Sequence, residues 1–152
     1  MCNKEWAKQI DEAVDNEAYW STDDIGTKRW YLNNQLHRED GPALIWLDNG
    51  TEWYLHGQLH RVDGPAVSGP DDGYEAWYIG GLLHRVEGPA VIQADGSERW
   101  YLHSKLHRED GPAVIWPSGI VGWYLNGKEL TEDEVWAIKF KKQVDEAVDN
   151  AA

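Results

Sequence analysis

The sequence lacks several residue types that mark common classes of protein. It has one cysteine, one phenylalanine and one methionine in 152 residues. The single cysteine, Cys2, cannot form an intramolecular disulfide, which excludes a disulfide scaffold and favours a reducing compartment. No run of 18 or more apolar residues exists, and the N-terminus has no signal-type apolar stretch. We therefore expect a cytoplasmic protein that does not bind membranes.

Basic residues are also scarce. Lys and Arg number 14 against 27 Asp and Glu, giving a net charge of -13 that is spread along the whole chain. Phosphate binding needs clusters of Lys and Arg, so direct binding to nucleic acid is not expected. Gly-rich phosphate loops, a nucleophile elbow and zinc-type cysteine spacing are absent as well. The sequence predicts no catalytic residue, no metal site and no cofactor.

The residues that are abundant recur with a fixed period. The chain has ten Trp and seven Tyr, and Trp-Tyr pairs are spaced by 23, 24, 23 and 23 residues. These pairs start at Trp30, Trp53, Trp77, Trp100 and Trp123. Between them a block of the form Leu-His-Arg-x-Asp/Glu-Gly-Pro-Ala occurs at 36–43, 59–66, 83–90 and 106–113. Such a period is the signature of a repeat protein.

Each unit predicts a hairpin with a two-residue turn. The turn residues are Asn33-Asn34, His56-Gly57, Gly80-Gly81, His103-Ser104 and Asn126-Gly127. Asn and Gly favour the positive φ angles of a type I′ turn, which would place Tyr54 opposite Leu59 and Trp53 opposite His60. A second, Gly-containing turn precedes the next Trp-Tyr pair. We therefore expect a mainly β fold, an elongated antiparallel meander of hairpins over residues 26–130, with a buried ladder of Trp and Leu.

The two ends of the chain differ from the repeats. Thr131 and Glu134 form a capping box, which predicts a C-terminal capping helix over 131–152. An N-terminal amphipathic helix and linker are expected over 1–25, because residues 8–18 match 142–152 at nine of eleven positions. The two helices either cap the array or pair to form a homodimer. The candidate dimer residues are Trp6, Ile10, Val14, Trp136, Phe140, Val144 and Val148.

The 23-residue period, the Asn-Gly or Asp-Gly turns and the aromatic hairpins resemble MORN repeats. The resemblance covers about Trp30 to Gly127 and looks like a divergent subclass found in bacterial and bacteriophage proteins. Its Trp-Tyr-Leu-x-Gly and His-Arg-x-Asp-Gly-Pro-Ala signatures differ from the usual Gly-x-Gly and Tyr-x-Gly ones. The resemblance implies a hairpin array that binds something, usually another protein, and it does not imply an enzyme.

The repeated His-Arg-x-Asp block has two interpretations. In the structural one, each His stacks on the opposite Trp and each acid accepts hydrogen bonds from the turn or the Arg. In the other, the blocks form a row of ligand-binding sites. The candidate residues are His37, His60, His84, His107, Arg38, Arg61, Arg85 and Arg108. The four-residue spacing of His56 and His60 would suit a metal only on a helix.

Three tryptophans have no repeated structural role. Trp20, Trp46 and Trp116 are therefore candidates for exposed contacts with a partner. The function expected is a non-enzymatic, acidic protein-interaction module whose partner has a basic or apolar surface. One version is a bacteriophage inhibitor that occludes a host defence protein in the host cytoplasm. The alternatives are a protein that sequesters small anions or nucleotides, a DNA mimic, and a structural oligomerisation unit.

Overall fold

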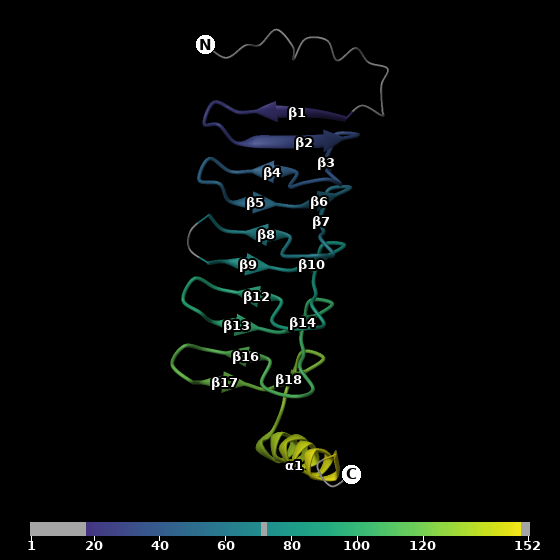
Figure 1. The fold of residues 1–152 in the computed structure, drawn as a ribbon, viewed down its shortest axis with the longest axis vertical. Helices are drawn as coiled ribbons and strands as arrows, with labels where there is room; N and C mark the ends of the chain where they lie inside the picture. The colour runs from purple at the N-terminus through teal and green to yellow at the C-terminus, as the bar shows by residue number, and fades with distance from the viewer. Residues whose placement is uncertain (1–17, 71–72, 150–152) are drawn as a thin grey trace.

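The computed structural model describes residues 18–70 and 73–149 as a tall stack of β-hairpins followed by one α-helix (Figure 1). The predicted mainly β fold of antiparallel hairpins is confirmed, and so is the C-terminal helix. The predicted N-terminal helix, with Trp6, Ile10 and Val14, lies outside the described residues. The side chains of Val144 and Val148 also lie outside what the structure describes.

A long antiparallel sheet forms one side of the stack. Each strand pairs with its neighbours in the order β1-β2-β4-β5-β8-β9-β12-β13-β16-β17, and β3 (Gln35–Leu36) pairs with β2. The strands are β1 (Ala18–Thr22), β2 (Lys28–Leu32), β4 (Leu44–Ile45), β5 (Thr51–Glu52), β8 (Val67–Ser68), β9 (Glu75–Ala76), β12 (Val91–Ile92), β13 (Glu98–Arg99), β16 (Val114–Ile115) and β17 (Val121–Gly122). Each repeat adds two strands to this sheet.

Strand β1 extends the sheet beyond the predicted array. Its five residues pair with β2 in the register Tyr19 to Tyr31 and Trp20 to Trp30. Residues 1–25 were expected to form an N-terminal helix and linker, so a strand at 18–22 was not predicted. The order Tyr19-Trp20 reverses that of the repeats, which is why this strand escaped the pattern.

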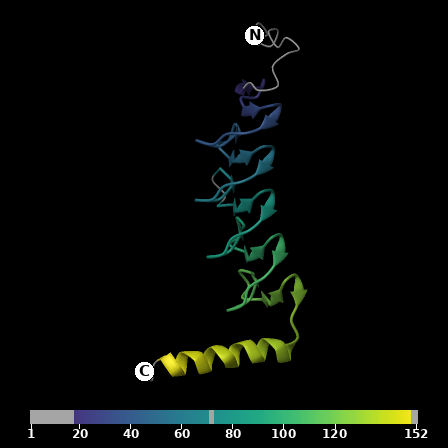
Figure 2. The same ribbon diagram turned by 90° about the vertical axis from the view of Figure 1, so that its right-hand side faces the viewer.

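Short hairpins form a second column beside the long sheet (Figures 1 and 2). They are β6 (Tyr54–Leu55) with β7 (Gln58–Leu59), β10 (Tyr78–Ile79) with β11 (Leu82–Leu83), β14 (Tyr101–Leu102) with β15 (Lys105–Leu106), and β18 (Tyr124–Leu125) with β19 (Lys128–Glu129). The chain leaves the long sheet after Trp53, makes the short hairpin, and returns at Ala66, whose carbonyl accepts from Trp53 N–H at 2.7 Å. The array is therefore two columns, whereas the sequence suggested one simple meander.

The predicted two-residue turns are confirmed in all five hairpins. Both turn residues have positive φ in every case, including 49° at His103 and 60° at Ser104. Tyr54 pairs with Leu59, as the turn length requires. Neighbouring hairpins are joined by hydrogen bonds, such as Gly57 N–H to the Leu36 carbonyl at 2.8 Å.

The buried residues of the array are mostly small. The fully buried apolar side chains are a row of alanines: Ala43, Ala66, Ala76, Ala90 and Ala113. The five repeat tryptophans are only half-buried. The expectation of a buried Trp and Leu ladder was therefore wrong. Leu44, Val91 and Val114 are also buried, so this thin stack of strands covers small and aliphatic side chains and leaves the large rings partly exposed.

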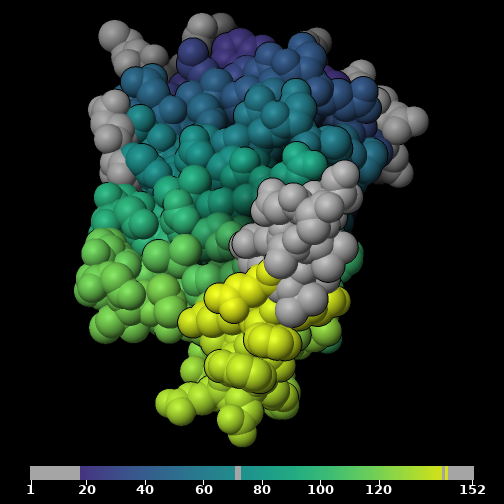
Figure 3. Space-filling view, turned by 60° about the horizontal axis from the view of Figure 1, so that its bottom comes forward, coloured from purple at the N-terminus to yellow at the C-terminus, as the bar shows by residue number. Residues whose placement is uncertain are grey.

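Helix α1 (Glu132–Asp149) begins at the predicted capping box. Glu134 N–H donates to Thr131 Oγ1 at 3.3 Å, and Thr131 N–H donates to Glu134 Oε2 at 2.8 Å. The helix runs across the long axis of the stack (Figure 2) and projects from its C-terminal end (Figure 3). Trp136 and Phe140 remain 65% and 51% exposed, so the apolar face of the helix does not cap the last hairpin.

Candidate functional site

Each repeat holds its arginine flat against its own tryptophan. The guanidinium carbons of Arg38, Arg61, Arg85 and Arg108 lie 4.4, 4.1, 3.9 and 4.1 Å from the ring centroids of Trp30, Trp53, Trp77 and Trp100. We expected the histidine to stack on this ring, and that expectation was wrong. A planar cation is attracted to the face of an indole more strongly than a neutral imidazole is. In the fifth unit Lys139 of α1 takes the place of arginine, 5.2 Å from the Trp123 ring.

The rest of the block holds the arginine in place. In the second repeat Arg61 donates from Nε to Asp63 at 3.0 Å and from Nη1 to the Pro65 carbonyl at 3.3 Å. This hydrogen bond and the charge of Arg61 lower the pKa of Asp63. A Cβ at Gly64 would lie 2.8 Å from the Arg61 guanidinium carbon. A side chain at Gly64 would therefore displace the guanidinium, which lies close to the glycine backbone and to the Trp53 ring.

The first and fourth repeats have the same arrangement, and the third departs from it. Arg38 and Arg108 reach their aspartates at 2.8 Å. The third repeat carries Glu87 instead, and no ion pair joins it to Arg85 in the described part of the chain. Arg85 keeps its bond to the Pro89 carbonyl at 3.0 Å, and Gly88 has a φ of 114°. This loop therefore presents a carboxylate that its own arginine does not neutralise.

The histidines join each repeat to the next. The Nδ1 atom of His60 accepts a hydrogen bond from Gly80 N–H at 3.1 Å, at the first residue of the following turn. His37, His84 and His107 make the same bond to His56, His103 and Asn126, at 3.1, 3.4 and 3.2 Å. Accepting through Nδ1 requires that this atom carry no proton. Burial, with a smaller effect of His103, lowers the pKa of His84, which favours the neutral ring.

These contacts involve all eight candidate residues of the His-Arg blocks in packing within and between repeats. The predicted interaction between the acid and the arginine is confirmed in three repeats. Within the described ranges, no group of three or more His, Cys, Asp or Glu side chains is arranged to hold a metal ion. Packing therefore accounts for the His and the Arg of each block, although the histidine bonds to the next repeat and does not stack on the tryptophan.

The three tryptophans without a repeated role have different environments. Trp20 is 59% exposed and stacks at 6.5 Å on Trp30 of the neighbouring strand. Trp46 is 41% exposed and donates from Nε1 to Glu52 at 3.0 Å. Trp116 is half-buried. Trp20 and Trp46 therefore present ring surface to solvent, and Trp116 presents less.

Sequence reasoning missed a row of exposed side chains at the variable position of the His-Arg-x-Asp block. We call it the loop row, and its members are Glu39, Val62, Val86 and Glu109. Val62 and Val86 are 82% and 78% exposed. The side chains of Glu39 and Glu109 are 83% and 84% exposed, with an oxygen 3.7 Å from Nε2 of the preceding histidine. The signal that could have found the row is the change of residue at one position of an otherwise constant block.

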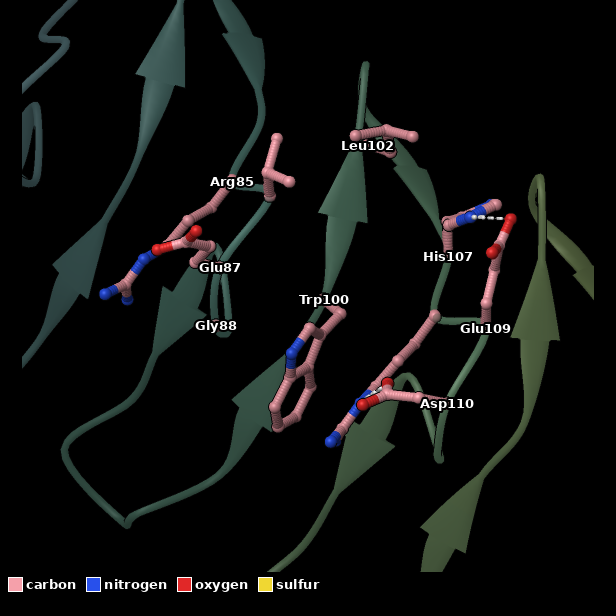
Figure 4. Close-up of a pocket in the computed structure, with 10 residues that line it drawn as sticks. Arg85, Glu87, Gly88, Trp100, Leu102, His107, Glu109 and Asp110 are labelled. Carbon is pink, nitrogen blue, oxygen red and sulfur yellow. Dashed lines mark hydrogen bonds and ion pairs between the residues drawn. The ribbon is translucent and has the colours of Figure 1, made fainter. Parts of the chain in front are cut away.

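A groove of about 570 Å³ lies beside the loop row between the third and fourth repeats (Figure 4). The loop carrying Glu87 and Gly88 forms one wall, and the loop carrying Glu109 and Asp110 forms the other. Trp100 lies between the two loops, with Arg108 against its ring. The groove therefore combines an aromatic ring with carboxylates and with the guanidinium groups of Arg85 and Arg108.

Comparisons with known proteins found no matching protein-family model, no matching curated protein and no matching solved structure. In the described residues, no helix is both long enough and apolar enough to span a membrane.

Proposed function

We propose that this chain is a MORN-like repeat protein that acts as a non-enzymatic protein-interaction module. One observation carries the proposal. Large apolar side chains remain exposed on a scaffold whose repeated polar residues are engaged in its own packing. Exposed apolar groups beside charged ones are typical of surfaces that bind other proteins. The module would act by covering the surface of its partner, as an adaptor or an inhibitor does.

Charge supports a partner with basic or apolar character. The net charge is -13, and the Asp residues of the repeated blocks are tied to arginines, which leaves other carboxylates on the surface. A protein of this charge attracts basic surfaces and associates faster with them at low salt. An inhibitor that occludes a host defence protein in an infected cell is one role that this surface suits.

A second candidate function is homodimerisation through α1. Trp136 and Phe140 stack with their ring centroids 5.1 Å apart and are exposed on the helix. Two copies of this helix could bury the ring pair across a two-fold axis. In this case Trp136→Ala would change the sedimentation coefficient from that of a dimer to that of a monomer. A wild-type protein that sediments as a monomer would exclude homodimerisation.

The main proposal is tested by affinity capture from cells of the natural source, followed by binding measurements with the purified partner. The expected result is a saturable complex that weakens as salt is raised, because the charged groups involved are exposed. The control bait is a variant with Trp20→Ser and Trp46→Ser, which removes the two exposed indoles. A wild-type bait that retains no protein beyond those of an empty resin would contradict the proposal.

A further inference from the structure

The strongest unassigned feature is the loop row, because its chemistry changes along the array while its geometry repeats. The order is acidic, apolar, apolar, acidic: Glu39, Val62, Val86 and Glu109. All four side chains are exposed to nearly the same degree. Since the fold is served equally by Glu and Val at this position, folding alone does not require the two valines.

The spacing of the row follows from the sheet. Each repeat adds two strands, so equivalent loops lie about 10 Å apart and the four-residue row spans about 29 Å. Seven residues of α-helix rise about 10.5 Å, and about 20 residues span 30 Å. A helix lying along the array would therefore place one residue opposite each member of the row, and these residues would be seven positions apart in its sequence.

Charge complementarity identifies the residues that such a helix would carry. The two central positions would be aliphatic, because they meet Val62 and Val86, and the outer two would be Lys or Arg, because they meet Glu39 and Glu109. Glu87, which makes no ion pair with Arg85 in the described residues, adds a carboxylate beside Val86. An apolar centre with a charged rim is the usual anatomy of a protein interface.

We propose that the loop row is the docking surface for an amphipathic helix of a partner protein, with aliphatic residues at its centre and basic residues at both ends in a seven-residue spacing. This proposal rests on the proposed function and specifies the surface and the partner chemistry. The occupant is a helix that follows the long axis of the array, and it contacts the loops through side chains at every seventh position.

The probe is a synthetic helical peptide of about 22 residues that carries Lys, Leu, Leu and Lys at intervals of seven on one face. Binding to the full chain is followed by changes in NMR amide shifts, which report weak complexes and their location. The expected shifts fall in the loops at 39–41, 62–64, 86–88 and 109–111. A second peptide with the order Leu, Lys, Lys, Leu controls for composition, and it is expected to bind about tenfold more weakly.

The decisive variant is Val62→Glu with Val86→Glu. It gives the second and third loops the residue that the first and fourth carry, so the fold tolerates it. Its affinity for the first peptide is expected to fall at least about tenfold, because two apolar contacts are replaced by carboxylates facing leucine. The matched control is Ile25→Glu with Leu47→Glu, at exposed apolar positions in the turns of the long sheet, and it should leave the affinity within about twofold.

Equal binding of the first peptide to the wild type and to the Val62→Glu, Val86→Glu variant would overturn the loop row as the docking surface. Shifts that cluster on α1 instead would overturn it as well. The same variant used as bait separates this failure from failure of the proposed function. A partner retained by the wild type and by the variant refutes the loop row alone, whereas a wild-type bait that retains none refutes both.

Discussion

The account of the Arg-Trp stack predicts that Gly64→Ala destabilises the protein through Arg61 and not through the backbone. The φ angle at Gly64 is not positive, so alanine is compatible with the backbone conformation there. Its Cβ would lie 2.8 Å from the Arg61 guanidinium carbon, so the guanidinium must move off the Trp53 ring. The substitution therefore acts on a contact between two other side chains.

The magnitude follows from the contacts that Arg61 would lose. A cation–π contact at a partly exposed site contributes about 0.5–1 kcal/mol, and the hydrogen bond to the Pro65 carbonyl contributes a similar amount. The expected loss is about 1–2 kcal/mol, which lowers the Tm by about 2–8 °C in a chain of this size. Thermal unfolding followed by near-ultraviolet circular dichroism measures it, because the signal depends on the packing of the Trp rings.

A double-mutant cycle isolates the cause of that loss. In an Arg61→Ala background the clash is absent, so adding Gly64→Ala should cost nothing or stabilise the protein slightly by restricting the unfolded chain. The two substitutions are therefore expected to be strongly non-additive. If Gly64→Ala costs as much in the Arg61→Ala background as in the wild type, the guanidinium is not the reason for the glycine.

Three further predictions concern a histidine link between repeats, the glycines of the two turn types and the cap of α1. The folded pKa of His84 lies below its ordinary value of 6.5, so as pH falls below about 6.5 the unfolded chain binds the proton first and stability is lost. His84→Gln should reduce the loss of Tm between neutral and acidic pH, and an unchanged loss would count against this role. Gly81→Ala places a side chain at a φ of 77° and should lower the free energy of unfolding, measured in urea, by about 1 kcal/mol. Gly96→Ala controls for backbone strain alone, because Gly96 also has a positive φ and an added Cβ there would have no neighbour within 4 Å. Thr131→Ala removes the first partner of the capping box and should destabilise α1 by about 1 kcal/mol, seen as a loss of helical ellipticity; retention of the full signal would contradict the capping geometry.

The repeat made the hairpins predictable, because turn length and turn residues determine register locally. The pairing of Tyr54 with Leu59 needed only the count of residues across His56-Gly57. The capping box at Thr131 was predictable for the same reason, since its two partners lie three residues apart. Backbone features that depend on the count of residues along the chain were thus available from the sequence.

Features that depend on contacts between units were not predictable. The second column of hairpins and the buried alanines depend on how one repeat stacks on the next. One side-chain contact within a unit was wrongly predicted as well. The Trp53 ring was expected to meet His60, directly opposite in the hairpin, whereas Arg61 of the same unit folds back over the ring and His60 bonds to Gly80 of the next repeat. The loop row lies at the variable position of the block, whereas the repeat is defined by the constant residues.

We propose that the constant residues of the block build the array and that the variable exposed residues bind a partner. The measurement that tests it most directly is the affinity of a captured partner for the wild type, for Val62→Glu with Val86→Glu, and for Arg61→Ala with Arg108→Ala. The account predicts that the valine variant keeps its Tm and loses affinity, while the arginine variant loses Tm and keeps its affinity under conditions where it remains folded. The reverse pattern, with binding lost through the arginines at unchanged Tm and retained without the valines, would contradict it.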